Sequence, residues 1–209
     1  MPARTGLPLW LKLAFSAWIV VWAPTYAFAI GPQNFFWLCN VANFLILAGL
    51  WTESRRLLSM QLLSVLLVGV GWTIDVGTAV VAGFHPIGGT EYMLDENVPL
   101  ALRSLSLYHV ILPVVAVYAV ARLGYDRGAL AWQSVLTWVM IPLSWFLTDA
   151  ERNINWVHQP FNQTQDLLGP IAYLVVLMLL WPLVIYLPTH LLVLAVRRRR
   201  SAGRRSDRA

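Results

Sequence analysis

Long apolar segments separated by short polar ones dominate the pattern of this chain. A membrane-spanning helix needs about 20 mostly apolar residues, and Gly31-Pro32-Gln33 is a sharp break after the first such segment. The pattern predicts an all-α membrane protein, a bundle of about six transmembrane helices. The expected spans are residues 9–30, 34–51, 57–81, 98–121, 129–147 and 167–196.

Composition agrees with this pattern. Hydrophobic residues make up 58% of the chain and charged residues only 12%, whereas soluble domains carry about 25% charged residues. The 11 tryptophans also favour a membrane, because indole rings prefer its interfaces. We expect one six-helix transmembrane domain, residues 1–196, followed by a basic cytoplasmic tail, residues 197–209.

The basic residues predict an orientation in the cell membrane. With the N-terminus inside, 13 of the 15 Lys and Arg residues fall in cytoplasmic segments, as the positive-inside rule requires. Both termini are then cytoplasmic. The basic tail directly follows an apolar run, so its expected partner is anionic membrane lipid and not nucleic acid. The acidic residues assigned to the outer loops are Glu91, Asp95, Glu96, Asp149, Glu151 and Asp166.

A few polar residues lie within the predicted spans, where they are costly and therefore informative. By the predicted topology, Cys39, Asp75 and Arg103 lie in the outer half of the bilayer and His109 near its middle. We expect these side chains to line one cavity that opens to the outer face. The amides in the second span are Asn40 and Asn43.

Together these residues contain the parts needed for acyl transfer. A thiol such as Cys39 becomes a strong nucleophile when a base removes its proton. The imidazole of His109 is that base, and the carboxylate of Asp75 is a candidate to orient it. Asn40 or Arg103 is expected to stabilise an oxyanion.

Each residue also has a structural interpretation that pattern alone leaves open. A single cysteine in an apolar helix packs as a small hydrophobe, and His109 fits an interhelical hydrogen bond. Asn40 and Asn43 fit amide contacts between helices. A charge at membrane depth needs compensation, so we expect an acidic partner for Arg103 among Asp75, Asp95 and Glu96.

Five short segments, which form three matches in order along the chain, resemble the YwaF-like family of bacterial integral membrane proteins. Trp37-Leu38-Cys39-Asn40 resembles its His-Leu-Cys-Asn segment, and the later segments resemble its Gly-Gly-Thr loop, Ser-His helix, Asn-rich loop and Gly-Pro stretch. These later segments are Gly88-Gly89-Thr90, Ser106-Leu107-Tyr108-His109, Asn153-Ile154-Asn155-Trp156 and Leu168-Gly169-Pro170-Ile171-Ala172-Tyr173.

The family is related to a eukaryotic ether-phospholipid acyltransferase that uses a Cys and a His. It is also related to the androgen-induced lipid hydrolases, which use a Thr and a His. The resemblance implies that Cys39 is the nucleophile and His109 its base. Trp37 stands where the family has a histidine, which bears on whether the chain is active.

The sequence therefore predicts an intramembrane lipid acyl hydrolase or acyltransferase that works from the outer leaflet on a lipid ester. Neither a metal nor an organic cofactor is expected, and the oligomeric state is left open. The alternatives are a non-catalytic lipid- or ligand-binding membrane protein and a small carrier or partner subunit.

Overall fold

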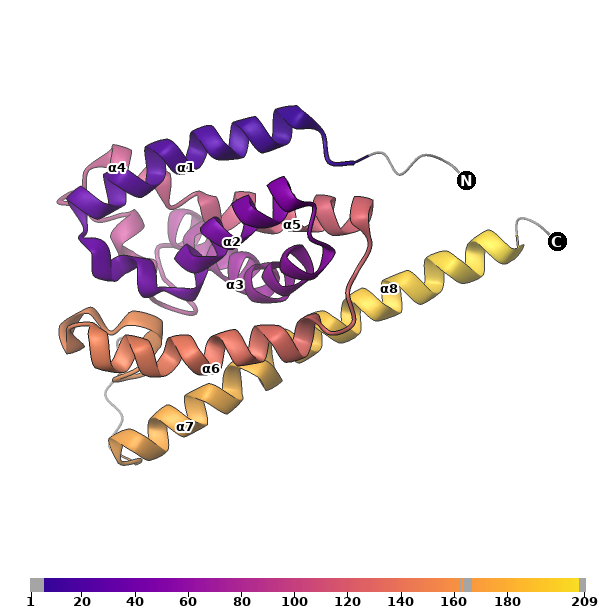
Figure 1. Ribbon diagram of the computed structural model, residues 1–209. Helices are drawn as coiled ribbons and strands as arrows, with labels where there is room; N and C mark the ends of the chain where they lie inside the picture. The colour runs from indigo at the N-terminus through magenta and orange to yellow at the C-terminus, as the bar shows by residue number, and fades with distance from the viewer. Residues whose placement is uncertain (1–5, 162, 164–166, 207–209) are drawn as a thin grey trace.

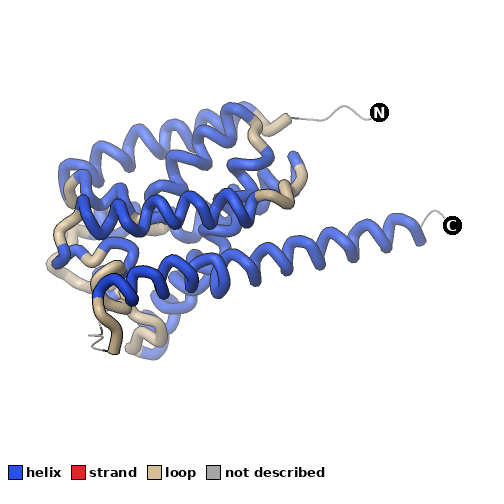
Figure 2. Tube along the Cα trace, turned by 60° about the horizontal axis from the view of Figure 1, so that its bottom comes forward, coloured by secondary structure: helices blue, strands red, loops and turns tan. Residues whose placement is uncertain are grey.

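The computed structural model describes residues 6–161, 163 and 167–206. Every regular element in this part of the chain is a helix (Figures 1 and 2). Asp166, which the sequence assigned to an outer loop, lies outside the described residues. The helices are α1 (Leu9–Ala29), α2 (Leu38–Thr52), α3 (Arg55–Ala82), α4 (Leu100–Leu105), α5 (Tyr108–Leu123), α6 (Ala129–Leu147), α7 (Pro170–Leu180) and α8 (Leu187–Ser206).

Five helical stretches are long and apolar enough to cross a membrane. They correspond to the first, third, fourth, fifth and sixth expected spans. The second expected span is shorter, because the chain leaves Gly31 at a φ of 100° and forms a 3₁₀ turn, Pro32–Phe36, before α2 begins. The 15 residues of α2 extend about 22 Å by the helical rise, less than the roughly 30 Å of a bilayer core.

Two other expected spans differ in detail. The fourth is divided into α4 and α5, which meet at Ser106 and Leu107. The sixth is one helical run from α7 through a π-helical turn, Trp181–Tyr186, into α8. The helix does not end at the expected residue 196 but continues to Ser206, so α8 projects beyond the other helices (Figure 1).

The π-helical turn contains Pro182, which has no N–H to donate to the carbonyl four residues earlier. That carbonyl belongs to Met178, and it accepts a hydrogen bond from Trp138 Nε1 of α6 at 2.9 Å. In lipid, a freed backbone group must find a partner within the protein. α6 therefore supplies the hydrogen bond that the proline removes from the last helix.

The helices α3 and α5 approach each other closely at Gly69. A Cβ atom at Gly69 would lie 2.3 Å from the His109 carbonyl oxygen and 2.5 Å from Pro113 Cγ. In a regular helix the residue at position 113 would donate its N–H to this carbonyl, but proline has no N–H. The oxygen of His109 lies against α3 instead. The glycine allows the two backbones to approach at this point.

A buried amide ties the loop after α6 to the start of α2. Asn155 Oδ1 accepts a hydrogen bond from the Leu38 N–H at 2.9 Å. Its Nδ2 donates to the Phe36 carbonyl and to Ser144 Oγ, both at 2.8 Å. Asn155 has a φ of 55°, a left-handed conformation that asparagine tolerates better than most residues. This side chain fixes the place where α2 begins.

The two ends of the bundle differ. α1 begins and α8 ends at the same end, which we call the terminal end (Figures 1 and 2). The two longest connections, which follow α3 and α6, lie at the opposite end, which we call the loop end. Cys39 and Asp75 lie on the parts of α2 and α3 nearest the loop end.

The contact at Gly69 gives a direct test of this packing. Alanine normally stabilises a helix by about 1 kcal/mol relative to glycine. Gly69→Ala is expected instead to lower the free energy of unfolding by about 1–3 kcal/mol, because the new methyl group collides with α5. Thermal unfolding of the detergent-solubilised protein measures the change.

Gly77→Ala is the matched control, since it lies on the same helix and nothing lies within 4 Å of its Cβ position. We expect this variant to be neutral or slightly stabilised. Equal melting temperatures for the two variants would contradict the close approach of α3 and α5.

Candidate functional site

Cys39 is the second residue of α2 and is half-buried. Its position depends on Asn155, which holds the N–H of the preceding residue. Its own carbonyl accepts a hydrogen bond from Asn43 Nδ2 at 3.3 Å, and Asn43 Oδ1 accepts one from Trp18 Nε1 at 3.0 Å. Asn43 therefore joins α2 to α1, as expected of an amide contact between helices.

The thiol lies within hydrogen-bond distance of the Tyr108 hydroxyl. Tyr108 Oη lies 3.3 Å from Cys39 Sγ and 2.5 Å from Asn40 Oδ1. Asn40 Nδ2 donates to the Asn34 carbonyl at 2.7 Å. The oxygen of the Asn40 amide thus faces the site, while a nitrogen would be needed to hold an oxyanion. The hydroxyl has a single proton, so Tyr108 donates either to the sulfur or, over the shorter distance, to Asn40 Oδ1.

His109 lies in the first turn of α5, and its ring is fixed on both faces. Nδ1 lies 2.9 Å from the Ser106 carbonyl oxygen. A carbonyl only accepts, so Nδ1 carries the proton and the lone pair of a neutral ring is on Nε2. The imidazole stacks on Trp72 at a centroid distance of 5.1 Å and on Tyr108 at 4.1 Å.

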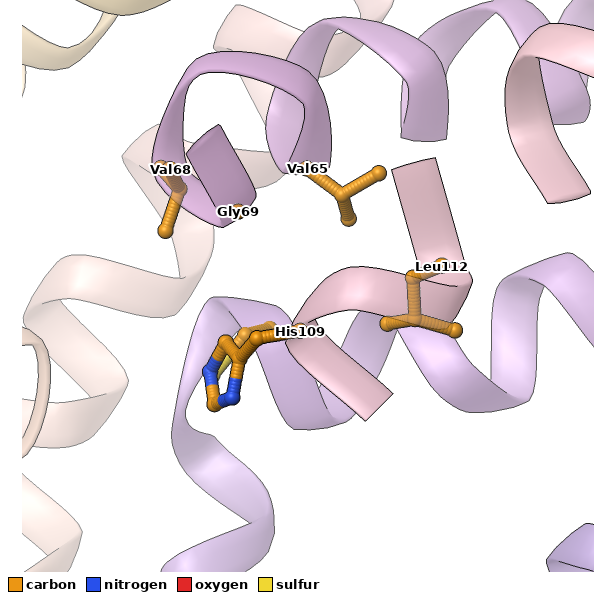
Figure 3. Close-up of a pocket in the computed structure, with 6 residues that line it drawn as sticks. Val65, Val68, Gly69, His109 and Leu112 are labelled. Carbon is orange, nitrogen blue, oxygen red and sulfur yellow. The ribbon is translucent and has the colours of Figure 1, made fainter. Parts of the chain in front are cut away.

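Cys39 and His109 line the same small cavity, between α2, α3 and α5 (Figure 3). Its space is about 10 Å³, room for about one water molecule. No hydrogen bond joins the thiol to the imidazole within the part of the chain that the structure describes. Tyr108 links the two, because its hydroxyl lies 3.3 Å from the sulfur and its ring stacks on His109. The cavity is lined by Cys39, Val65, Val68, Gly69, His109 and Leu112.

Asp75 is buried on α3 and is saturated with hydrogen bonds from the loop that follows this helix. Oδ1 accepts from the N–H groups of Ile87 at 2.6 Å and Gly88 at 3.0 Å. Oδ2 accepts from the Thr90 hydroxyl and lies 3.1 Å from His85 Nδ1. The carboxylate thereby folds the loop back onto the end of α3.

The structure does not bring Asp75 to His109, the imidazole that it was predicted to orient. That role falls to the backbone carbonyl of Ser106. The histidine beside Asp75 is His85, which sequence analysis did not single out. A carboxylate next to a nearby Pro-x-Gly-Gly turn is a signal for such a loop anchor, because the turn presents free N–H groups.

Arg103 also has a different partner from the one expected. Its Nη1 donates to the Met93 carbonyl at 3.0 Å, and its Nε is buried without a partner. Among the described residues, no carboxylate forms a salt bridge with it, so the expected pairing with Asp75, Asp95 or Glu96 is wrong. Backbone dipoles at the loop end compensate this charge instead.

Sequence analysis also missed the aromatic residues around the thiol and imidazole. Tyr108 and Trp72 were passed over because tryptophan and tyrosine in a membrane chain are usually interface anchors. The available signal was the position of Tyr108 directly before the candidate base. Trp37, which replaces the family's histidine, packs edge-on against Trp156 of the loop after α6, at 5.3 Å.

No group of three or more His, Cys, Asp or Glu side chains in the described part of the chain is arranged to hold a metal ion. No model of a known protein family, no curated protein and no solved structure matches the chain. The resemblance to the YwaF-like family therefore stays a prediction that rests on the segments quoted above.

Proposed function

We propose that the protein is a six-span membrane protein that hydrolyses or transfers lipid acyl groups, with Cys39 as nucleophile and His109 as general base. The observation that carries this proposal is that Cys39 and His109 line the same cavity. The imidazole lone pair is on Nε2, and aromatic rings hold the imidazole on both faces. A thiol and a preoriented base at one cavity are the minimal parts of this chemistry.

Six spans are favoured by the positions of the chain ends. Five crossings would place the start of α1 and the end of α8 on opposite faces of the membrane. These two helix ends instead lie at the terminal end of the bundle (Figures 1 and 2). α2 must therefore return the chain across the membrane, and its short length is extended by the 3₁₀ turn before it.

The proposed reaction begins with transfer of the Cys39 thiol proton to His109 Nε2. The sulfur then attacks the ester carbonyl, the carbon–oxygen bond breaks, and the departing alcohol takes the proton from the imidazolium. Water or an acceptor hydroxyl next gives its proton to His109 and attacks the thioester. The sulfur leaves as a thiolate and is reprotonated, which completes hydrolysis or transfer.

The Tyr108 hydroxyl is placed to stabilise this chemistry. It lies 3.3 Å from the sulfur, close to where the carbonyl oxygen would become an oxyanion. A phenol O–H is a suitable donor for such a charge once its single proton turns from Asn40 Oδ1 toward the oxyanion. In this proposal Tyr108 takes the role that the sequence assigned to Asn40, whose oxygen faces the site, or to Arg103, which bonds a carbonyl outside it.

Entry of a substrate requires the cavity to widen, because an acyl chain does not fit in the room of one water molecule. The lining residues contributed by α3 and α5 are apolar, namely Val65, Val68 and Leu112. Rotation of these side chains would open a path lined with hydrocarbon. Such a path suits an acyl chain that enters sideways from the outer leaflet.

The central test is covalent labelling of the purified protein with a thiol-directed lipid electrophile. Cys39→Ala should abolish labelling. His109→Ala should slow labelling by about 100-fold or more, the usual contribution of a general base. The double variant should remain unlabelled, like Cys39→Ala alone.

His158→Ala is the matched control, because this ring packs at a tilt against Trp145 and does not line the cavity. It should label at the normal rate. An unchanged labelling rate in His109→Ala would show that the thiol needs no base, and would favour the non-catalytic alternative.

Tyr108→Phe tests the hydroxyl beside the sulfur. The ring and its stacking are kept, so the fold should be unchanged, while kcat for hydrolysis of an activated ester should fall by about 100-fold. Tyr186→Phe is the control, since it removes a buried hydroxyl that bonds Thr137 at 2.6 Å elsewhere in the bundle. Equal losses in the two variants would mean that Tyr108 has only a packing role.

Reporter fusions test the orientation. Alkaline phosphatase fused after residue 206 should be inactive in the cell, because the basic terminal end is placed in the cytoplasm. The same enzyme inserted in the loop between α3 and α4 should be active. The reverse pattern would overturn the proposed topology.

A further inference from the structure

Arginines gather at the terminal end of the bundle. They come from the start of α3, from the last turn of α5 and the connection that follows it, and from the part of α8 that projects beyond the bundle. All of these side chains are exposed, at a level where apolar helix surface gives way to polar loops. They are Arg55, Arg56, Arg122, Arg127, Arg197, Arg198 and Arg199.

The described carboxylates at this end are already paired. Glu53 accepts a hydrogen bond from Lys12 Nζ at 2.8 Å, and this contact keeps the pKa of Glu53 below its ordinary value. Asp126 pairs with Arg56 at 3.4 Å. Among the described residues, no carboxylate forms a salt bridge with Arg55. The cluster therefore keeps a large positive excess.

Two of these arginines converge on one glycine. The Cβ position of Gly124 lies 3.5 Å from Arg55 Cδ and 3.8 Å from Arg197 Nη1. Gly124 has a φ of 96°, a conformation that glycine adopts readily, and it ends α5 at this point. The space that a side chain would fill at Gly124 is lined by one arginine from α3 and one from α8.

Apolar surface lies next to this arginine pair. Leu191, Leu192 and Val196 on α8 are exposed, within two turns of Arg197. A guanidinium group binds phosphate through two parallel N–H donors. A ligand that fits both features has an anionic phosphate at one end and hydrocarbon at the other.

We propose that Arg55 and Arg197 bind the phosphate of an anionic phospholipid whose acyl chains lie along α8. A nucleic acid fits less well, because its phosphates would contact the arginines but it has no hydrocarbon to cover the neighbouring leucines. The proposal does not depend on the proposed catalytic reaction, because the arginine pair and the Cys39 cavity lie at opposite ends of the bundle.

The test compares lipid binding to the purified full chain in neutral detergent by native mass spectrometry. Phosphatidylglycerol should bind with a lower Kd than phosphatidylcholine. The double variant Arg55→Gln with Arg197→Gln should raise the Kd for phosphatidylglycerol by about 30-fold, because charge-assisted hydrogen bonds are lost. Binding of phosphatidylcholine should not change.

The double variant Arg198→Gln with Arg199→Gln is the matched control, since it removes two positive charges from α8 at the positions that follow Arg197. Its Kd should rise by less than about threefold. Arg55→Lys with Arg197→Lys keeps the charge and loses the paired donors, so an intermediate Kd is expected even if the glutamine variant fails to fold. Equal effects of the two glutamine variants, or equal binding of both lipids to the unaltered chain, would overturn the proposal.

Discussion

α5 can lie against α3 only because position 69 carries no side chain. The approach puts the His109 carbonyl, which Pro113 cannot bond, directly against α3. This contact sets the height of His109 in the bundle and leaves Gly69 as one wall of the cavity. One more methyl group at this contact would push α5, and the imidazole with it, away from α3. The candidate chemistry therefore depends on a backbone contact more than on any charged group.

Two buried polar side chains then hold the loop end in place. Asp75 gathers the loop after α3, and Asn155 fastens the loop after α6 to the first residue of α2. Each has its hydrogen-bonding atoms matched to backbone and side-chain groups around it, an arrangement that is costly to disrupt where water is scarce. Because Cys39 follows the residue that Asn155 holds, this loop positions the thiol from outside the helix that carries it.

The membrane-length helices could be predicted from the apolar pattern, since lipid imposes length and composition on every span. The pattern did not predict the short α2, because a left-handed glycine followed by a 3₁₀ turn delays the helix within an apolar segment. Cys39 and His109 were predicted, and they line one cavity. The partners of His109 and Arg103 were not, because both are backbone carbonyls, which have no sequence signature. The partners of Asp75 were also missed, because the signal of the Pro-x-Gly-Gly turn was not used.

The hydrogen bond from Trp138 to the Met178 carbonyl has a consequence for how the protein is made. A membrane helix usually satisfies its own backbone and can be inserted alone. The last helix satisfies its backbone less completely, since Pro182 leaves the Met178 carbonyl without its internal donor. In lipid, this helix would therefore be more stable with α6 already present, because the Trp138 indole supplies that donor. This favours insertion of α6 and the last helix together, as a helical hairpin. The Trp138 side chain would then set the register between the two helices.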